Sequence, residues 1–287
     1  MPLKKLWAEY FTRDIPAHVV EYLTQQRGLS PEIIRHHQLG WNRFRITIPV
    51  FARNGSLAFL KLARLPDDNP ELPKFSCWPS GNSAELYGWE HLGKVKPDLL
   101  VICEGELDRL VLESCGIPAV TGTAGAGVFL QKWADALSSI PNIYVCLDRD
   151  EAGRKGAEHI SGMIPHAKIV GLPEEVGHGG DITDFFVRLG KSVDDFRKLL
   201  DQAQPIPEEG RQTLSQKQTT AKSGHKQRAI YSSDPRIQFI KQNVALEEIA
   251  KNYINELRPS GSTLVGRCPF HADTQPSRVL SAGVRDF

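Results

Sequence analysis

Acidic residues directly follow two apolar segments in the middle of the chain, where they could hold a metal ion. Glu104 follows the run Leu99–Cys103. Asp148 and Asp150 follow the run Ile143–Leu147. Because side chains two apart on an extended segment share a face, Asp148 and Asp150 are expected to point the same way.

A third acidic cluster, Gly180–Asp184, follows the next apolar run, and Asp181 is its candidate ligand. Carboxylates that converge on one point repel each other, and a divalent cation removes that conflict. Hard oxygen ligands suit Mg²⁺ or Mn²⁺. The sequence therefore predicts a metal site that is built by Glu104, Asp148, Asp150 and Asp181.

An alternative role for each of these acids is to cap a helix. Carboxylates favour helix N-termini, and a single acid after a strand is more often a cap than a ligand. For Asp148 or Asp150 taken alone, capping is the commoner role. Three acidic clusters after three successive strands favour the metal site.

The elements that must position these acids alternate between strand and helix. Strands are expected at 99–103, 119–121, 143–147 and 168–172, and helices at 108–115, 129–138 and 152–163. This alternation predicts an α/β fold with a parallel sheet covered by helices. Ligands of such sheets bind beyond the carboxyl ends of the strands, which is where the acids lie.

The region before this sheet, residues 1–97, mixes helix and strand signals. The expected elements are a helix at 15–26, a second helix that begins after Ser30, strands at 43–52 and 56–63, and a loop at 66–83. Ser30 followed by proline is a helix start, and Asn54-Gly55 predicts a hairpin between the two strands. His36 and His37 fall on an expected surface helix and receive no role.

Composition excludes several classes of protein. The chain has 287 residues, of which 40% are hydrophobic, and a formal net charge of +1. These values exclude global disorder and a chain that is basic throughout. No apolar run reaches the roughly 18–20 residues of a membrane span, and the N-terminus lacks the apolar core of a signal peptide. Five cysteines, mostly single residues in apolar runs, are typical of a reducing cytoplasm.

The C-terminal third of the chain differs in character. Residues 202–233 are polar and are predicted to form a flexible linker. Residues 234–287 hold one amphipathic helix, expected at 237–253, and then the motif Cys268-Pro-Phe-His271. We therefore expect four regions, at 1–97, 98–201, 202–233 and 234–287.

Four motifs resemble those of the Toprim domain, in the version found in bacterial and phage DNA primases of the DnaG type. They are EGELD from Glu104, GTA from Gly122, DRDEAG from Asp148, and Asp181. The resemblance implies a Toprim parallel sheet with flanking helices, preceded by a mixed α+β subdomain. It implies that Glu104, Asp148 and Asp150 are catalytic, and that these three and Asp181 are metal ligands.

The resemblance extends upstream and covers about residues 15–200. Pro73-Lys74-Phe75 and Leu86-Tyr87-Gly88 are similar to the lysine-bearing segment and the LYG sequence that precede Toprim in those primases. It implies that Lys74 and Arg64 contact the nucleoside triphosphate or the template backbone.

The activity that this resemblance implies is the synthesis of short RNA primers on single-stranded DNA by metal-dependent nucleotidyl transfer. Single-stranded DNA and nucleoside triphosphates would be the partners, and a replicative helicase is left open as a further one. No membrane partner is expected. A Toprim nuclease and a non-catalytic, nucleic-acid-binding remnant of a mobile-element primase are the alternatives.

The C-terminal segment resembles the opening of the CHC2 zinc-binding domain of the same primases. Cys268 and His271 supply two ligands, whereas a structural zinc site needs four, and no later pair of cysteines follows them. We therefore interpret the segment as an incomplete zinc finger, and expect that zinc does not bind there in this chain alone.

Overall fold

The computed structural model describes residues 15–92, 96–125 and 127–205, together with the backbone of three later strands. The chain divides into two compact units: one spans residues 3–221, and the other spans residues 222–287 with residues 1–2. No helix in the described part of the chain is both long and apolar enough to span a bilayer.

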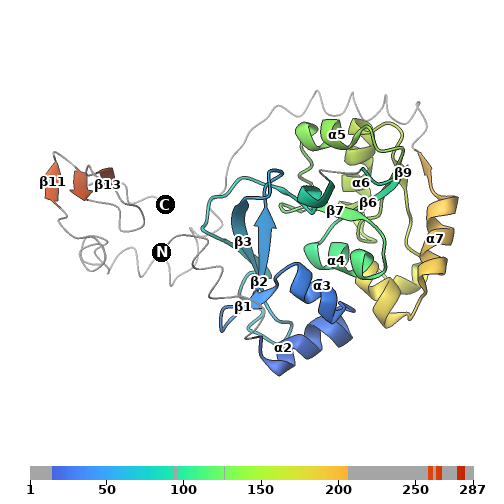
Figure 1. The fold of residues 1–287 in the computed structure, drawn as a ribbon, viewed down its shortest axis with the longest axis horizontal. Helices are drawn as coiled ribbons and strands as arrows, with labels where there is room; N and C mark the ends of the chain where they lie inside the picture. Colours follow the sequence, from blue (N-terminus) through green and yellow to red (C-terminus); the bar gives the residue numbers. More distant parts are fainter. Residues whose placement is uncertain are drawn as a thin grey trace. The chain divides into compact units, whose positions relative to one another are not determined.

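A four-stranded antiparallel sheet forms the first layer of the larger unit, in the order β1-β2-β3-β4 (Figure 1). Its strands are β1 Gly40–Trp41, β2 Ile46–Phe51, β3 Leu57–Ala63 and β4 Phe75–Trp78. Gly55 turns the hairpin between β2 and β3 with a φ of 76°, a conformation that glycine adopts without strain. The expected hairpin is therefore confirmed.

Two helices precede this sheet, as expected. Helix α2 (Ala17–Glu21) continues as a π-helical turn over Tyr22–Gln26. Helix α3 (Pro31–His36) begins at Ser30, whose hydroxyl accepts a hydrogen bond from the Ile33 amide. The serine cap satisfies one of the amides that the first turn leaves free.

Strand β4 corrects the expectation of a loop over residues 66–83. Phe75–Trp78 pairs antiparallel with β3, with Ala63 opposite Phe75 and Leu60 opposite Trp78. The strand is short, lies at the sheet edge and is only half-buried. Its flanks are rich in proline and polar residues, so the sequence gives little strand signal there.

A second sheet has six strands in the order β10-β9-β8-β6-β7-β5. They are β5 Leu86–Tyr87, β6 Leu99–Cys103, β7 Ala119–Gly122, β8 Asn142–Val145, β9 Lys168–Ile169 and β10 Gln204–Pro205. The four inner strands are parallel, and the two edge strands run antiparallel to them. This confirms the expected α/β class.

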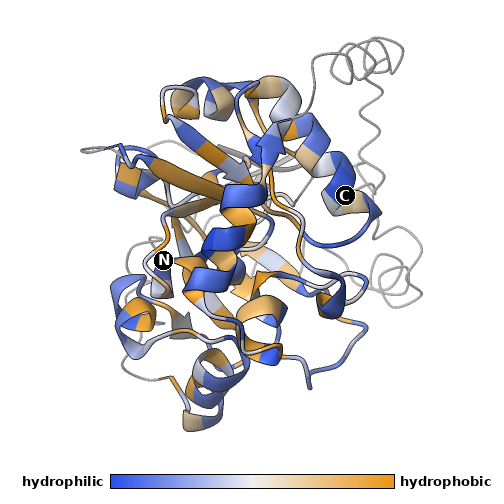
Figure 2. Ribbon diagram, turned by 90° about the vertical axis from the view of Figure 1, so that its right-hand side faces the viewer, coloured by the Kyte–Doolittle hydropathy of each residue, from blue (hydrophilic) through white to orange (hydrophobic). Residues whose placement is uncertain are grey.

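Helices cover both faces of the second sheet. They are α4 Glu106–Ser114, α5 Gln131–Leu137, α6 Glu151–Met163 and α7 Val193–Gln202. Alternate residues of β6 enter two separate cores: Val101 packs with residues of α4 and α7, and Leu100 packs with residues of α5 and α6. Figure 2 shows the result, with hydrophobic strands inside and helices that are hydrophobic on one side.

The smaller unit contains a three-stranded antiparallel sheet in the order β11-β12-β13. Its strands are β11 Arg258–Ser260, β12 Thr263–Gly266 and β13 Ser277–Ser281. The helix expected at 237–253, Cys268 and His271 lie outside the described residues.

Candidate active site: a carboxylate cleft beyond the parallel strands

A cleft of about 460 Å³ lies beyond the carboxyl ends of β6 and β8. Glu104 follows β6 directly. Asp148 follows β8 by way of Cys146, whose amide still donates to the Ile102 carbonyl at 2.9 Å. Glu104, Asp148 and Asp181 all line this cleft, so the structure brings together three of the four expected acids.

Glu104 and Asp148 are linked across the two strand ends. The Asp148 amide donates to Oε2 of Glu104 at 3.3 Å. Burial raises the pKa of Asp148 to about 8, and the charges of Glu104, Asp108, Asp181 and Asp150 add to the shift. The pKa of Glu104 is also raised, chiefly by burial. A divalent cation would relieve this crowding of negative charge.

Backbone hydrogen bonds hold Asp181 beside the loop that carries Asp148. Arg149 exchanges two of them with the neighbouring glycine loop: its amide donates to the Gly180 carbonyl at 2.9 Å, and its carbonyl accepts from the Gly179 amide at 3.0 Å. Oδ1 of Asp181 accepts from the Asp184 amide at 2.7 Å. Asp181 thus starts the following helical turn, and its Oδ2 lies 3.8 Å from Nη1 of Arg27.

Asp150 occupies the N-cap of α6. Its Oδ1 accepts a hydrogen bond from the Gly153 amide at 2.8 Å, and Asp150 lines a neighbouring hollow rather than the cleft. The structure therefore shows the capping role considered from the sequence. Gly153 is required at this position because a Cβ there would lie 2.1 Å from the Asp148 carbonyl oxygen.

Asp108 is a buried acid of the cleft to which the sequence reasoning gave no role. Its Oδ1 accepts from the Thr183 hydroxyl at 2.7 Å and lies 3.6 Å from Nη2 of Arg27. Burial raises the pKa of Asp108, and the charge of Asp181 raises it further. The sequence did offer one signal, because Asp108 lies four residues after Glu104 in the same EGELD motif, in the first turn of α4.

A buried ion pair forms another part of the wall. Nζ of Lys61 donates to Oε1 of Glu106 and, at 3.0 Å, to the Thr123 carbonyl. The Lys61 and Glu106 side chains are 10% and 1% exposed, so each charge depends on its partner for stabilisation. Burial raises the pKa of Glu106, and Lys61 opposes that shift. Lys61 was detectable as the one charged residue in the apolar strand β3.

The two expected nucleotide-contacting residues both line the cleft. Nζ of Lys74 lies 5.6 Å from the centre of the Phe75 ring, and its charge lowers the pKa of Glu104 against the effect of burial. Arg64 is tied to its own loop, because Nη1 donates to the Asp68 carbonyl at 2.7 Å. Lys74 is therefore better placed than Arg64 to meet a bound phosphate.

The cleft thus has carboxylates at the strand ends, and basic side chains from the first sheet and from the segment after α2. Its basic residues are Arg27, Lys61, Arg64 and Lys74. Carboxylate oxygens can hold a divalent cation, and the cations can contact phosphate oxygens. This combination suits chemistry on a phosphate ester.

Comparisons with known proteins agree with this geometry. A family model described as Toprim-like matches residues 101–186, and a model of the CHC2 zinc finger matches residues 232–286. The Gene 57 protein of Mycobacterium phage D29 is 32% identical over 141 residues, which cover 49% of this chain and 86% of that protein.

Cellular primases are also similar. The DNA primase of Pasteurella multocida is 24% identical over 233 residues, which cover 63% of this chain and 39% of that protein. The structure of a DnaG primase catalytic domain bound to single-stranded DNA superposes with a TM-score of 0.58 at 21% identity, over 87% of this chain and 88% of that one.

The chain spans less than half the length of the bacterial primases that it matches. The phage relative, in contrast, is matched over most of its length. The two family models correspond to the Toprim and CHC2 resemblances found from the motifs. With the fold of a primase catalytic core and both families of sequence motif, this chain belongs to the Toprim-containing primases of the DnaG type.

Proposed function

We propose that this chain synthesises short RNA primers on single-stranded DNA. The observation that carries the proposal is the convergence of Glu104, Asp148 and Asp181 in one cleft whose basic wall includes Lys74. Primer extension is a displacement at an α-phosphate, and such a barrier falls mainly through positioning and neutralisation of charge. The cleft offers groups for both tasks.

The donor set fits Mg²⁺ or Mn²⁺, since it consists of carboxylate oxygens. We assign Glu104, Asp148 and Asp181 as the residues that would hold the metal, and Asp150 as a fourth candidate through its Oδ2, because its Oδ1 caps α6. When bound, the metal would activate the 3′-hydroxyl of the primer and stabilise the leaving pyrophosphate.

The basic residues would position the phosphates. Lys74 would meet the triphosphate or the template backbone, and Arg64 would contribute from the rim of the cleft while it braces the loop that follows β3. The charge of Lys61 is neutralised by Glu106, so we propose that Lys61 supports the wall of the cleft and does not contact the nucleic acid.

We propose that the C-terminal region is related to the CHC2 zinc finger, whose family model matches residues 232–286. Cys268 and His271 supply two of the four ligands that a structural zinc needs. We therefore propose that these two residues alone do not hold zinc tightly. The linker expected at 202–233 is corrected at its start, because Gln202 ends α7 and Gln204–Pro205 form β10. We propose that a linker within residues 206–233 separates this region from the primase core.

We also propose a cellular location and a protein partner for this chain. Cytoplasmic location is supported by the free thiols of the four described cysteines. A replicative helicase is proposed as a partner on family membership alone. Co-purification of the full chain with the helicase of its host would test that partnership.

A primer-synthesis assay tests the main proposal. Labelled ribonucleotides, single-stranded template and Mg²⁺ or Mn²⁺ should yield short RNA with the wild-type chain and none with Asp148→Asn. Asp194→Asn is the matched control, because Asp194 is an exposed carboxylate on α7 outside the cleft. Cleavage of a labelled oligonucleotide without synthesis would instead show a nuclease, and template binding without either product would show a non-catalytic remnant.

A further inference from the structure

Three histidines gather away from the carboxylate cleft. His36 and His37 lie at the C-terminal end of α3, and His91 lies in the 3₁₀-helix Trp89–Leu92. One ligand nitrogen from each ring lies within 4.8 Å of the others. The ring centres are 4.9 to 5.4 Å apart. None of the three lines the carboxylate cleft.

We propose that His36, His37 and His91 form a binding site for a divalent transition metal of the zinc class. Imidazole nitrogen is a preferred ligand of Zn²⁺, Cu²⁺ and Ni²⁺, whereas Mg²⁺ prefers oxygen. Three imidazoles with an open fourth position are a known ligand set for zinc. The site would therefore select a different metal from the carboxylate cleft.

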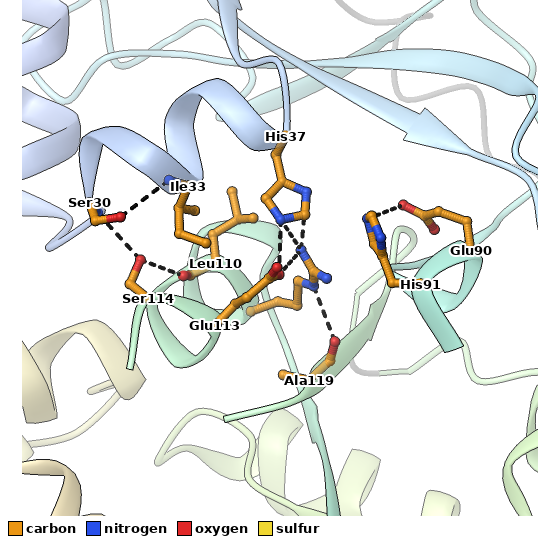
Figure 3. Close-up of polar contacts among 10 residues, drawn as sticks. Ser30, Ile33, His37, Glu90, His91, Leu110, Glu113, Ser114 and Ala119 are labelled. Atoms are coloured by element: carbon orange, nitrogen blue, oxygen red, sulfur yellow. Dashed lines mark hydrogen bonds and ion pairs between the residues drawn. The ribbon is translucent and has the colours of Figure 1, made fainter. Parts of the chain in front are cut away.

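Carboxylates already contact two of the rings, as Figure 3 shows. Nε2 of His37 lies 2.9 Å from Oε2 of Glu113, and Nε2 of His91 lies 3.4 Å from Oε1 of Glu90. At His91 the carboxylate at Nε2 orients the ring and leaves Nδ1 available as a ligand. At His37 the Arg109 guanidinium lies 3.1 Å from Nε2 and 3.4 Å from Nδ1, so His37 can bind an ion through Nδ1 only when this guanidinium turns away from the ring. Such carboxylate–histidine pairs are the usual surroundings of a protein-bound metal.

Arg109 is the group that opposes a cation here. Its Nη1 lies 3.1 Å from Nε2 and 3.4 Å from Nδ1 of His37, and 2.6 Å from Oε2 of Glu113. Its Nε donates to the Ala119 carbonyl at 3.1 Å. Glu113 neutralises this guanidinium, and Glu90 adds a second negative charge beside His91. One cationic side chain is thus matched by two carboxylates, so the surroundings carry no net positive charge.

The geometry allows closure around an ion. Tetrahedral zinc with bonds of about 2.1 Å needs ligand nitrogens about 3.4 Å apart. The present separations are within 4.8 Å, so the ligand nitrogens must approach each other when an ion binds. His37 is fixed and buried, with a side chain 4% exposed. His36 is exposed and the His91 side chain is 43% exposed, so both can rotate toward it.

A hollow of about 320 Å³ beside the cluster is lined by His91, Arg109 and Glu113. It leaves room for a water molecule as the fourth ligand. A metal there would also join the end of α3 to the segment at residues 89–92, which are far apart in the sequence. The site is thus expected both to bind metal and to stabilise the fold.

Cobalt binding to the full chain tests the proposal without any measurement of primer synthesis. The probe is Co²⁺, titrated in excess Mg²⁺ so that hard oxygen sites are filled, into a chain that carries Cys268→Ala and His271→Ala. We expect one Co²⁺ per chain with tetrahedral visible bands, displaced by Zn²⁺, and a rise in melting temperature when the metal binds.

Variants decide where the ion sits. His36→Ala and His91→Ala should each abolish this binding, and Glu113→Gln should weaken it about 10–100-fold. His18→Ala, which removes an exposed histidine outside the cluster, should leave it unchanged. Melting temperatures without metal must match the wild type, which shows that the variants fold. Absence of binding, or binding that survives both His36→Ala and His91→Ala, would overturn the proposal.

Discussion

Replacing Asp148 with asparagine should stabilise the metal-free protein while it abolishes primer synthesis. Asp148 is half-buried among other acids, and its side chain accepts no hydrogen bond among the described contacts. Asparagine keeps the size of the side chain and removes only the charge. The gain in stability comes from relief of repulsion, and the loss of activity comes from loss of a ligand.

The size of the gain follows from the pKa of Asp148, which rises from 3.8 to about 8 on folding. The folded protein then holds a proton that the unfolded chain releases, so stability falls as the pH rises from about 4 toward 8. At pH 7 this penalty is about 4 kcal/mol without solvent screening. Because Asp148 is only half-buried, screening reduces it to about 2 kcal/mol.

Urea unfolding with a chelator present measures the effect. Asp148→Asn should unfold with a free energy about 2 kcal/mol higher than the wild type at pH 7, and with a difference under about 1 kcal/mol at pH 4.5. Asp194→Asn should change the free energy by less than about 0.5 kcal/mol at either pH. Added Mg²⁺ should then stabilise the wild type more than Asp148→Asn.

Two results would refute this reasoning. Destabilisation by Asp148→Asn at pH 7 in chelator would mean that the acids do not repel each other in the folded protein. Equal stabilisation of both proteins by Mg²⁺ would mean that Asp148 is not a ligand.

Three further substitutions probe other parts of the cleft. Lys61→Met should lower the free energy of unfolding by about 3–5 kcal/mol because it leaves the Glu106 carboxylate buried and unpaired. Adding Glu106→Leu should restore part of this stability, and the absence of any restoration would contradict the pairing. Lys74→Ala should weaken binding to single-stranded DNA of any sequence and lower the salt slope by about one unit, as fluorescence anisotropy at several salt concentrations would show; an unchanged slope would exclude a phosphate contact. Gly153→Ala should lower both the melting temperature and primer synthesis, since its Cβ would meet the Asp148 carbonyl at 2.1 Å; wild-type values for both would show that the loop yields easily.

Features that depend on local sequence were predictable. The Ser30 cap, the hairpin at Asn54-Gly55 and the alternation of the parallel sheet each arise from residues close together in the chain. The acids at the strand ends were predictable too, because parallel strands present their carboxyl ends at one edge.

Features set by tertiary contacts were not predictable in the same way. Strand β4 forms because its backbone pairs with β3, and the residues of β4 themselves give little indication of a strand. His37 is buried rather than on a surface helix, because Arg109 and Glu113 of α4 pack against it. For Asp150 the sequence admitted both cap and ligand, and only the position of the Gly153 amide showed the cap.

The Lys61–Glu106 pair has a consequence for how this protein can be divided. Lys61 belongs to the first sheet and Glu106 to the first helix of the Toprim region, so the pair crosses the boundary expected near residue 97. A fragment that begins at residue 98 would lack Lys61, so the Glu106 carboxylate would be either exposed to solvent or buried without a partner. The Toprim region of this chain is therefore not expected to fold stably when it is separated from strand β3. Recombination that exchanged the Toprim region between related proteins would also have to exchange β3, so that Lys61 and Glu106 remain paired.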